Sequence, residues 1–251
     1  MNRLQLNWDI RAALNFMLGG AGAGLMVTAG FSPNPRYSIV LSMLLVAGGL
    51  GAVWLEIGRK LRALHVFFNP FTSWMTREAF FAVLFFAFAG ISLAFPQFTA
   101  AAAFAALAFL YCQARILRAA KGIPAWRAPE VAPLIVSTGL AEGCGLALFF
   151  SSGIVLLGVF AFAVAVRAVA WMRYRAAVPT TALAGAGTSL LLLGTFAALA
   201  LAAAAWMVPL FAPLAGLAAA AAGWLMKLDL VTRAAFKQPL TLPHLPVRGT
   251  R

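Results

Sequence analysis

The sequence predicts an all-α integral membrane protein built as a bundle of eight transmembrane helices. Of its 251 residues, 63% are hydrophobic and only 10% are charged, whereas soluble domains carry about 25% charged residues. Apolar stretches of about 20 residues, the length that a helix needs to cross a bilayer, recur along the chain. Backbone polar groups in lipid must be satisfied within each stretch, so we expect every stretch to be helical.

Eight apolar segments follow one another in a single membrane domain that covers residues 1–251. In order, they are Ala12–Phe31, Ser38–Ile57, Glu78–Phe95, Phe98–Leu117, Val131–Phe150, Gly153–Met172, Leu183–Val208 and Leu210–Leu230. Very short linkers at Pro96-Gln97, at Ser151-Ser152 and around Pro209 predict antiparallel hairpins. Pro213 falls in the first turns of the last helix, where proline is tolerated. Residues 231–251 are expected to form a cytoplasmic tail.

Basic residues gather at one end of these segments. With eight spans, all of the 19 lysines and arginines except Arg36 fall on the side that holds both termini. The positive-inside rule then predicts that both termini are cytoplasmic. The expected location is the cytoplasmic membrane of a bacterium or archaeon. The net charge of +13 follows this topology, so it does not indicate a nucleic-acid partner.

Small residues are dense in the first and seventh spans. The run GGAGAG at Gly19–Gly24 and the triplet Gly185–Gly187 predict close approach of neighbouring helices. A phosphate-binding loop is excluded because no strand precedes the run, and close approach by a flat ligand ring is the alternative. Cys112 and Cys144 lie inside apolar segments and are expected to be small core residues.

The histidine count argues against internal haem. A membrane cytochrome with two bis-histidine haems needs four axial histidines, whereas this chain has only His65, in a linker, and His244, in the tail. The bundle is therefore predicted to be haem-free. No spacing of histidine, cysteine and carboxylate residues predicts a metal site either.

The linker between the second and third spans concentrates charge. The stretch Glu56–Glu78, EIGRKLRALHVFFNPFTSWMTRE, holds two of the six acidic residues together with four basic ones. One interpretation is a polar face at which electrons arrive from a soluble partner. The other is an ordinary positive-inside loop with interfacial aromatic residues.

Five polar side chains are expected at similar depth near this linker: Asn15, Glu56, Glu78, Tyr111 and Gln113. An amide and a phenol in this position can donate hydrogen bonds to the two carbonyl groups of a quinone. A nearby carboxylate can exchange the protons that accompany its electrons. The alternatives are an interhelical hydrogen bond for Asn15 and an aromatic-belt position for Tyr111.

Glu142 is the one acidic residue well inside a predicted span. An ionised carboxylate at that depth is costly, so Glu142 is protonated, paired with a base such as Arg167, or part of a proton route. The two residues lie at different predicted depths, which disfavours the pair, and a structural hydrogen bond is the simplest alternative. Asp229 is expected to form a surface ion pair with Lys227.

The stretch LEIGRKLRALHVFFNPFTSWMTRE resembles the connection between spans two and three of the NrfD-like membrane anchors. That family includes the anchors of polysulfide reductase and dimethyl sulfoxide reductase. Similar patterns follow in the family's order: ALNFMLGGAGAG at Ala13–Gly24, Tyr111 followed by GIPAWRAP at Gly122–Pro129, and SxGLAxG at Ser137–Gly143. The resemblance ends near Phe150, and the last three spans carry no specific motif.

The resemblance implies a quinone-reactive anchor that binds a ferredoxin-like iron–sulfur subunit. A third, catalytic subunit would carry a molybdenum or tungsten pterin cofactor, so the quinone is the only cofactor expected on this chain. In the polysulfide reductase branch, a histidine at the position of Asn15 and a tyrosine matching Tyr111 contact the quinone. Asn15 cannot titrate near neutral pH. Glu56, which stands where the dimethyl sulfoxide branch has a histidine, is therefore the proton-handling candidate.

Together these arguments define two groups of residues. The predicted quinone-site residues are Asn15, Tyr111, Glu56, Arg59, Arg77 and Glu78. The predicted partner interface comprises Arg62, His65, Ser73, Trp74, Arg115, Arg118 and Trp126. Glu142 is the candidate for a proton route.

The family's soluble subunits dock on the side of the termini, which the charge distribution places in the cytoplasm. The catalytic subunit is therefore expected to act on a cytoplasmic substrate, and the phenylacetyl-CoA:acceptor oxidoreductase type is the nearest resemblance. Two alternatives remain: a structural anchor without a quinone site, and a secondary transporter. A transporter would predict an inverted repeat and broken helices that meet in mid-membrane, and the sequence shows no convincing repeat.

Overall fold

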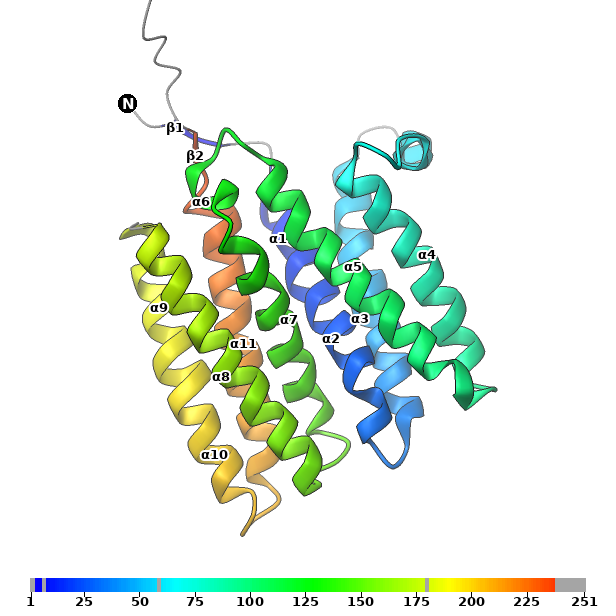
Figure 1. The fold of residues 1–251 in the computed structure, drawn as a ribbon, viewed down its shortest axis with the longest axis vertical. Coiled ribbons are helices and arrows are strands. Elements are labelled where there is room, and N and C mark those ends of the chain that lie inside the picture. The colour runs from blue at the N-terminus through cyan, green and yellow to red at the C-terminus, as the bar shows by residue number, and fades with distance from the viewer. Residues whose placement is uncertain (1–2, 6–7, 58–59, 179–180, 238–251) are drawn as a thin grey trace, which may run out of the picture.

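The computed structural model describes residues 3–5, 8–57, 60–178 and 181–237 (Figure 1). The long elements are helices that run antiparallel to their neighbours, with a two-residue strand near each end of the described chain. In order, the elements are β1 (Arg3–Leu4), α1 (Ile10–Leu14), η1 (Asn15–Gly19), α2 (Gly20–Thr28), η2 (Ala29–Phe31), α3 (Pro35–Glu56), η3 (Lys60–Phe68), α4 (Trp74–Ser92), η4 (Pro96–Phe98), α5 (Thr99–Ala119), α6 (Pro124–Arg127), α7 (Val131–Ala147), α8 (Ile154–Ala177), η5 (Thr181–Leu183), α9 (Ala184–Leu191), η6 (Leu192–Ala197), α10 (Ala198–Ala204), α11 (Phe211–Thr232) and β2 (Phe236–Lys237).

Within the described residues, seven helical stretches are long and apolar enough to cross a bilayer. They are Ile10–Phe31, Pro35–Glu56, Trp74–Ser92, Pro96–Ala119, Ile154–Ala177, Thr181–Ala204 and Phe211–Thr232. The predicted span Val131–Phe150 instead forms α7, which has 17 residues and ends at Ala147. The chain leaves the helix there in a tight turn, in which Phe150 N donates to Ala147 O at 3.0 Å.

Large apolar side chains cover the outward faces of the long helices. Leu44, Phe104, Phe162 and Phe196 are each exposed by more than 60%, which would be costly in water and is favourable in contact with lipid tails. The prediction of an all-α, multi-pass membrane protein is thus confirmed at this level.

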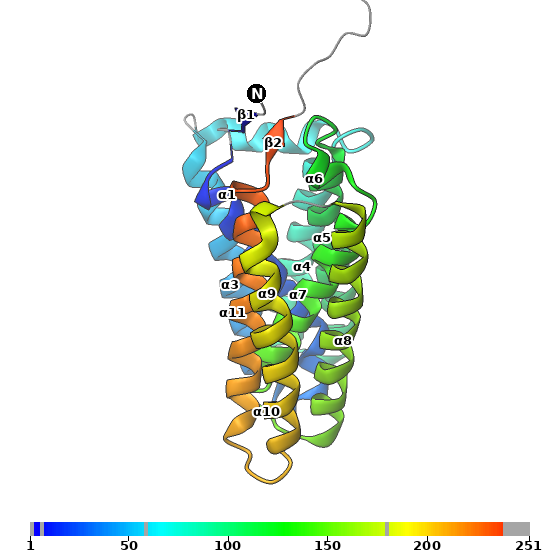
Figure 2. The ribbon, with the colours of Figure 1, turned by 90° about the vertical axis from the view of Figure 1, so that its left-hand side faces the viewer.

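The helices fall into two groups in Figure 1: those up to α5 lie on one side of the bundle, and α7 to α11 lie on the other. β1 and β2 pair antiparallel, with Leu4 opposite Phe236. The next residue continues the connection, because Gln5 N donates to Ala235 O at 2.9 Å. Both ends of the described chain therefore lie at the same end of the bundle, as Figure 2 also shows.

Glycines allow α7 to cross its neighbours at backbone contact. A Cβ atom on Gly24 of α2 would overlap the carbonyl of Gly139, and one on Gly143 would overlap the backbone of Gly24. On another side of α7, Gly145 meets Gly216 of α11 in the same way. The GGAGAG run therefore packs against a helix, as predicted, and α7 is held tightly between α2 and α11.

Two π-helical turns interrupt spanning helices. η1 lies between α1 and α2, and η6 lies between α9 and α10. A π turn inserts an extra residue into a helix and leaves backbone groups available to other partners, and such turns are frequent at functional sites. Neither turn was predicted, because nothing in the apolar pattern of the two spans marks them.

The linker Glu56–Glu78 is more ordered than a simple loop. Its central part, the 3₁₀ helix η3, lies across the end of the bundle (Figure 2). Ser73 caps α4 by accepting a hydrogen bond from Thr76 N at 3.3 Å, so this helix begins at Trp74 and includes Glu78 in its second turn.

Candidate functional site

A cavity of about 720 Å³ lies beneath η3, at the end of the bundle where β1 and β2 pair. Its walls come from α1, η1, α3, η3, α4 and α5. They comprise Trp8, Ala12, Asn15, Phe16, Leu50, Val53, Trp54, Glu56, Ile57, Ala63, Leu64, Val66, Phe67, Met75, Glu78, Ala79 and Ile116. Most of these side chains are apolar, with a few polar groups among them, which is the usual composition of a small-molecule site.

Asn15 and Glu78 form the polar wall of this cavity. Asn15 Nδ2 donates to Glu78 Oε1 at 3.1 Å, and both side chains are buried. The oxygen of the same amide, Asn15 Oδ1, has no hydrogen-bond partner among the described residues. Glu56, the third polar group of the wall, is half-buried. The structure thus brings together three of the six residues predicted for the quinone site.

Two side chains from other helices hold the π turn that carries Asn15. Gln113 Nε2 of α5 donates to Asn15 O at 2.9 Å, and Lys227 Nζ of α11 donates to Phe16 O at 2.9 Å. Both side chains are fully buried. Two consecutive backbone carbonyls of η1 therefore find partners outside their own helix, as buried polar groups require.

The interior of the bundle also contains three buried charged side chains. Lys227 Nζ lies 2.6 Å from Glu142 Oε2, and neither side chain is exposed. Arg167, equally buried, donates through its terminal nitrogens to two carbonyls, Ala219 O at 2.7 Å and Gly194 O of the second π turn. Buried charges must be paired or hydrogen-bonded, and each of the three groups has at least one partner, whereas Glu142 Oε1 and Arg167 Nε have none among the described residues.

Two expectations about these charges are therefore corrected. Lys227 is not a surface residue, because α11 turns it toward Glu142 and Phe16 O. Asp229 pairs instead with Arg233, one helical turn later, at 3.2 Å. The expectation that depth disfavours a Glu142–Arg167 pair is in line with the contacts, since neither carboxylate oxygen of Glu142 accepts a hydrogen bond from Arg167.

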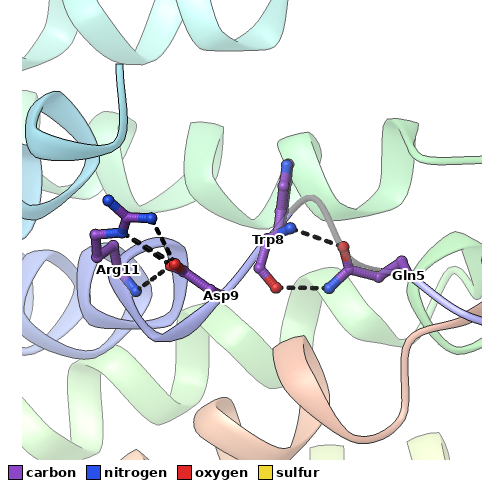
Figure 3. Close-up of polar contacts among 4 residues, drawn as sticks. All are labelled: Gln5, Trp8, Asp9 and Arg11. Carbon is purple, nitrogen blue, oxygen red and sulfur yellow. Dashed lines mark hydrogen bonds and ion pairs between the residues drawn. The ribbon is translucent and has the colours of Figure 1, made fainter. Parts of the chain in front are cut away.

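Trp8, in the chain segment that leads into α1, lines the cavity, and Figure 3 shows the polar contacts of this segment. Gln5 and Trp8 exchange two hydrogen bonds of 2.7 Å, and Trp8 stacks on Trp126 with ring centroids 4.9 Å apart. Asp9 caps α1 and accepts three hydrogen bonds from the guanidinium of Arg11, which lower the pKa of the Asp9 carboxyl below its usual value.

Tyr111 does not meet Asn15 in the cavity. It is 43% exposed, it is absent from the cavity wall, and its hydroxyl accepts a hydrogen bond from Arg115 at 2.8 Å. The ring packs edge-on against Trp74, with ring centroids 6.0 Å apart. A shared quinone site for Asn15 and Tyr111 is therefore wrong for this structure, and the phenol belongs to an aromatic cluster on the outer side of α4 and α5.

The same cluster contains Arg77. The guanidinium carbons of Arg77 and Arg115 each lie 4.3 Å from the ring centroid of Trp74, which is within the range of a cation–π contact. Arg77 also donates to Pro70 O at 2.8 Å and Phe71 O at 2.6 Å. Its observed role is to order the linker, and it is not part of the cavity wall.

The remaining residues predicted for the quinone site and the partner interface divide into three kinds. His65 is exposed on η3, and Arg118 lines a second cavity of about 990 Å³ near the end of α5. Trp126 is only 2% exposed and donates to Leu230 O at 2.8 Å, so it is corrected to a core residue. Arg59 lies outside the described residues, as does the side chain of Arg62.

Sequence reasoning missed Lys227 and Trp8 as neighbours of the site. Asp229 lies two positions after Lys227, and this spacing wrongly suggested that the two form an ion pair at the surface. The place of Lys227 after a long apolar run, six residues before Arg233, was the signal that could have identified it as buried.

Comparison of the sequence with protein-family models and with curated proteins found no match in either. Membership of the NrfD-like family therefore stays a prediction that rests on the motifs quoted above.

Proposed function

We propose that this chain is the membrane anchor and quinone-reactive subunit of a molybdenum or tungsten oxidoreductase complex. In this proposal it passes electrons between a ferredoxin-like iron–sulfur subunit and membrane quinone. The observation that carries the proposal is the apolar cavity of about 720 Å³ that has Asn15, Glu78 and Glu56 in its wall. Its volume and lining fit a flat, largely apolar ring system that carries two oxygen atoms.

The polar wall matches the chemistry of a quinone that gains or loses protons together with its electrons. Asn15 Oδ1, buried and without a partner among the described residues, is an acceptor for a quinol hydroxyl. Glu78, which already accepts a hydrogen bond from Asn15, supplies a carboxyl group for proton transfer. The half-buried Glu56 links the wall to the aqueous side. Bound quinone would supply the two-electron redox chemistry.

The electrons would enter from the end of the bundle that holds both chain ends. This end presents Arg77 and Arg115 stacked on Trp74, together with Arg118. A basic surface of this kind suits an acidic face of the iron–sulfur subunit. The positive-inside rule places this surface in the cytoplasm, and the catalytic subunit would then act on a cytoplasmic substrate such as an aromatic acyl-CoA.

Eight membrane crossings fit this topology. Counting α7 as the eighth, its 17 residues reach about 25 Å at 1.5 Å per residue, slightly less than the hydrocarbon core. The pairing of β1 with β2 supports an even number, because an odd number of crossings would leave the two ends on opposite sides.

One observation favours a second candidate function, that of a secondary transporter. Glu142, Lys227 and Arg167 lie buried inside the bundle, and two spanning helices are interrupted by π turns. Intramembrane charges and broken helices are features of transport sites. The two candidates differ in a simple observable, since only the anchor binds quinone at the cavity near Asn15.

The proposal is tested with the full chain in lipid nanodiscs, by titrating decylubiquinone and a soluble menaquinone analogue against intrinsic tryptophan fluorescence. Trp8 and Trp54 line the cavity and report on it. We expect binding by the natural chain, a loss of about tenfold or more in Asn15→Leu, and no change in Tyr111→Phe. Absence of binding by the natural chain, or equal losses in both variants, would refute the proposed site.

A further inference from the structure

The wall of the cavity is held from behind by a residue that does not touch the cavity. Lys227 is absent from the cavity lining, yet its ammonium group donates to Phe16 O, one residue after Asn15. Phe16 itself lines the cavity. The contact joins α11, in one half of the bundle, to η1, in the other half.

The contact is made to a π turn. In a regular α-helix, the carbonyl of residue 16 would be occupied by the amide four residues later. In η1, both Asn15 O and Phe16 O accept hydrogen bonds from side chains of other helices, Gln113 and Lys227. The backbone that orients Asn15 is therefore held by tertiary contacts in addition to its own helix.

Two glycines, at the end of η1 and the start of α2, make room for these contacts. A Cβ atom on Gly19 would lie 2.7 Å from Gln113 Nε2, and one on Gly20 would lie 2.6 Å from Lys227 Nζ. Both distances are shorter than van der Waals contact. Gly19 and Gly20 thus keep a channel open through which the two side chains reach the backbone.

Glu142 determines where the ammonium group lies. Its Oε2 atom is 2.6 Å from Lys227 Nζ, so the cation is held between a carboxylate on α7 and a carbonyl on η1. An unpaired lysine at this depth would lose its proton or turn toward water. The pair directs Lys227 Nζ at the π turn.

We infer that Lys227, held by Glu142, is a positioning residue for the quinone site, acting on Asn15 through the carbonyl of Phe16. The inference rests on the proposed function for its ligand. Its structural part, that Lys227 fixes the π turn, stands independently of what binds in the cavity.

Arg167 provides a matched control. It is a second fully buried cation, and it also binds a carbonyl of a π turn, but that carbonyl belongs to Gly194 of η6. No residue of η6 lines the cavity. Removing Arg167 therefore disturbs a buried cation that interacts electrostatically with Glu142 and Lys227 but has no described hydrogen bond to η1.

The experiment compares Lys227→Met/Glu142→Gln, which removes both charges of the pair, with Arg167→Met, each as the full chain in nanodiscs. Two quantities are measured: amide hydrogen exchange of a peptide covering residues 13–22, and the dissociation constant for decylubiquinone. In the double variant, we expect at least tenfold faster exchange in this peptide and about tenfold weaker quinone binding. In Arg167→Met, both quantities should stay within twofold of the natural chain.

Unchanged exchange in the double variant, or an equal increase in Arg167→Met, would overturn the inference. If the natural chain binds no quinone while the exchange pattern holds, the proposed function fails and the positioning role remains. Should the double variant not fold, Gly20→Ala keeps both charges and places a methyl group against Lys227 Nζ. The same increase in exchange is expected there, and its absence would also overturn the inference.

Discussion

The two π turns of this protein are alike in architecture and different in surroundings. Each interrupts a spanning helix, and each presents a backbone carbonyl to a buried cation: Phe16 O to Lys227 in η1, and Gly194 O to Arg167 in η6. Only η1 adds a polar side chain, Asn15, to the wall of a cavity. In this bundle, each π turn supplies a hydrogen-bond acceptor to a buried cation. The neighbouring side chains make only η1 a candidate site.

The two cations also differ in their counter-charge. Lys227 has a carboxylate at 2.6 Å, whereas the hydrogen bonds described for Arg167 go to carbonyls alone. Lys227 joins α11 and α7 to η1 in the other half of the bundle, while the arginine joins α8 to η6 and α11 within one half. The predictions below test this contrast.

The largest effect is expected for Glu142→Gln. The substitution keeps the shape of the side chain but leaves Lys227 without its counter-charge, and breaking a buried pair in this way costs about 3–5 kcal/mol. The free energy of unfolding, measured in mixed detergent micelles, should fall accordingly. The double variant Glu142→Gln/Lys227→Met should recover most of the loss. A loss in the single variant below about 1 kcal/mol would place the pair among weak surface ion pairs.

The next effect concerns the glycines beside the two cations. Gly20→Ala places a methyl group 2.6 Å from Lys227 Nζ, and Gly194→Ala places one 2.7 Å from Ala222 Cβ and 2.9 Å from an Arg167 nitrogen. Overpacking of this kind costs about 1–3 kcal/mol. Thermal unfolding should show similar losses for both, and only Gly20→Ala should weaken quinone binding. Equal weakening by Gly194→Ala would remove the distinction between the two turns.

A smaller pair of effects separates function from stability. Glu78→Gln retains an oxygen acceptor for Asn15 Nδ2, so we expect a stability change below about 1 kcal/mol together with loss of quinone-linked proton exchange. Thr195→Val in η6 removes the hydrogen bond of 3.0 Å to Leu190 O. It should cost about 1 kcal/mol without changing quinone binding. A stopped-flow pH indicator and a thermal scan distinguish the two outcomes, and unchanged proton exchange in Glu78→Gln would contradict the role of this carboxyl.

The smallest effect is expected at the start of the helix that carries η1. Asp9 caps α1, whereas α9 before η6 has no side-chain cap. Because the hydrogen bonds from Arg11 lower the pKa of Asp9, the cap contributes fully above the usual titration range of aspartate and is lost as the pH falls through the lowered value. Asp9→Asn retains a capping side chain and should remove this pH dependence with little change in melting temperature at pH 7. A persistent dependence would assign it to another group.

The sequence allowed the helical class and most helix positions to be predicted, because apolar length and turn residues determine them. It also singled out Asn15, Glu78 and Glu142. Depth in the membrane, however, does not determine which side of a helix a residue faces. Tyr111 and Gln113 lie at nearly the same depth, but two positions along a helix correspond to a rotation of about 200°. Gln113 is therefore buried against η1, and Tyr111 faces outward.

The shortness of α7 and the two π turns could not be predicted from composition either. Both depend on how neighbouring backbones meet: α7 lies where glycines allow contact on two sides, and each π turn lies where a cation from another helix needs a carbonyl. Such features come from partners that are distant in the chain, and local propensity carries no information about them.

The contact between Lys227 and Glu142 has a consequence for biosynthesis. The ribosome makes α7 long before α11, so the carboxyl group of Glu142 enters the membrane with no counter-ion, and the π turn near the amino terminus waits even longer for its donor. The Glu142 carboxyl group and the Phe16 carbonyl gain Lys227 as a partner only when the last helix inserts. We therefore expect nascent chains that lack α11 to be recognised by membrane proteases as incomplete.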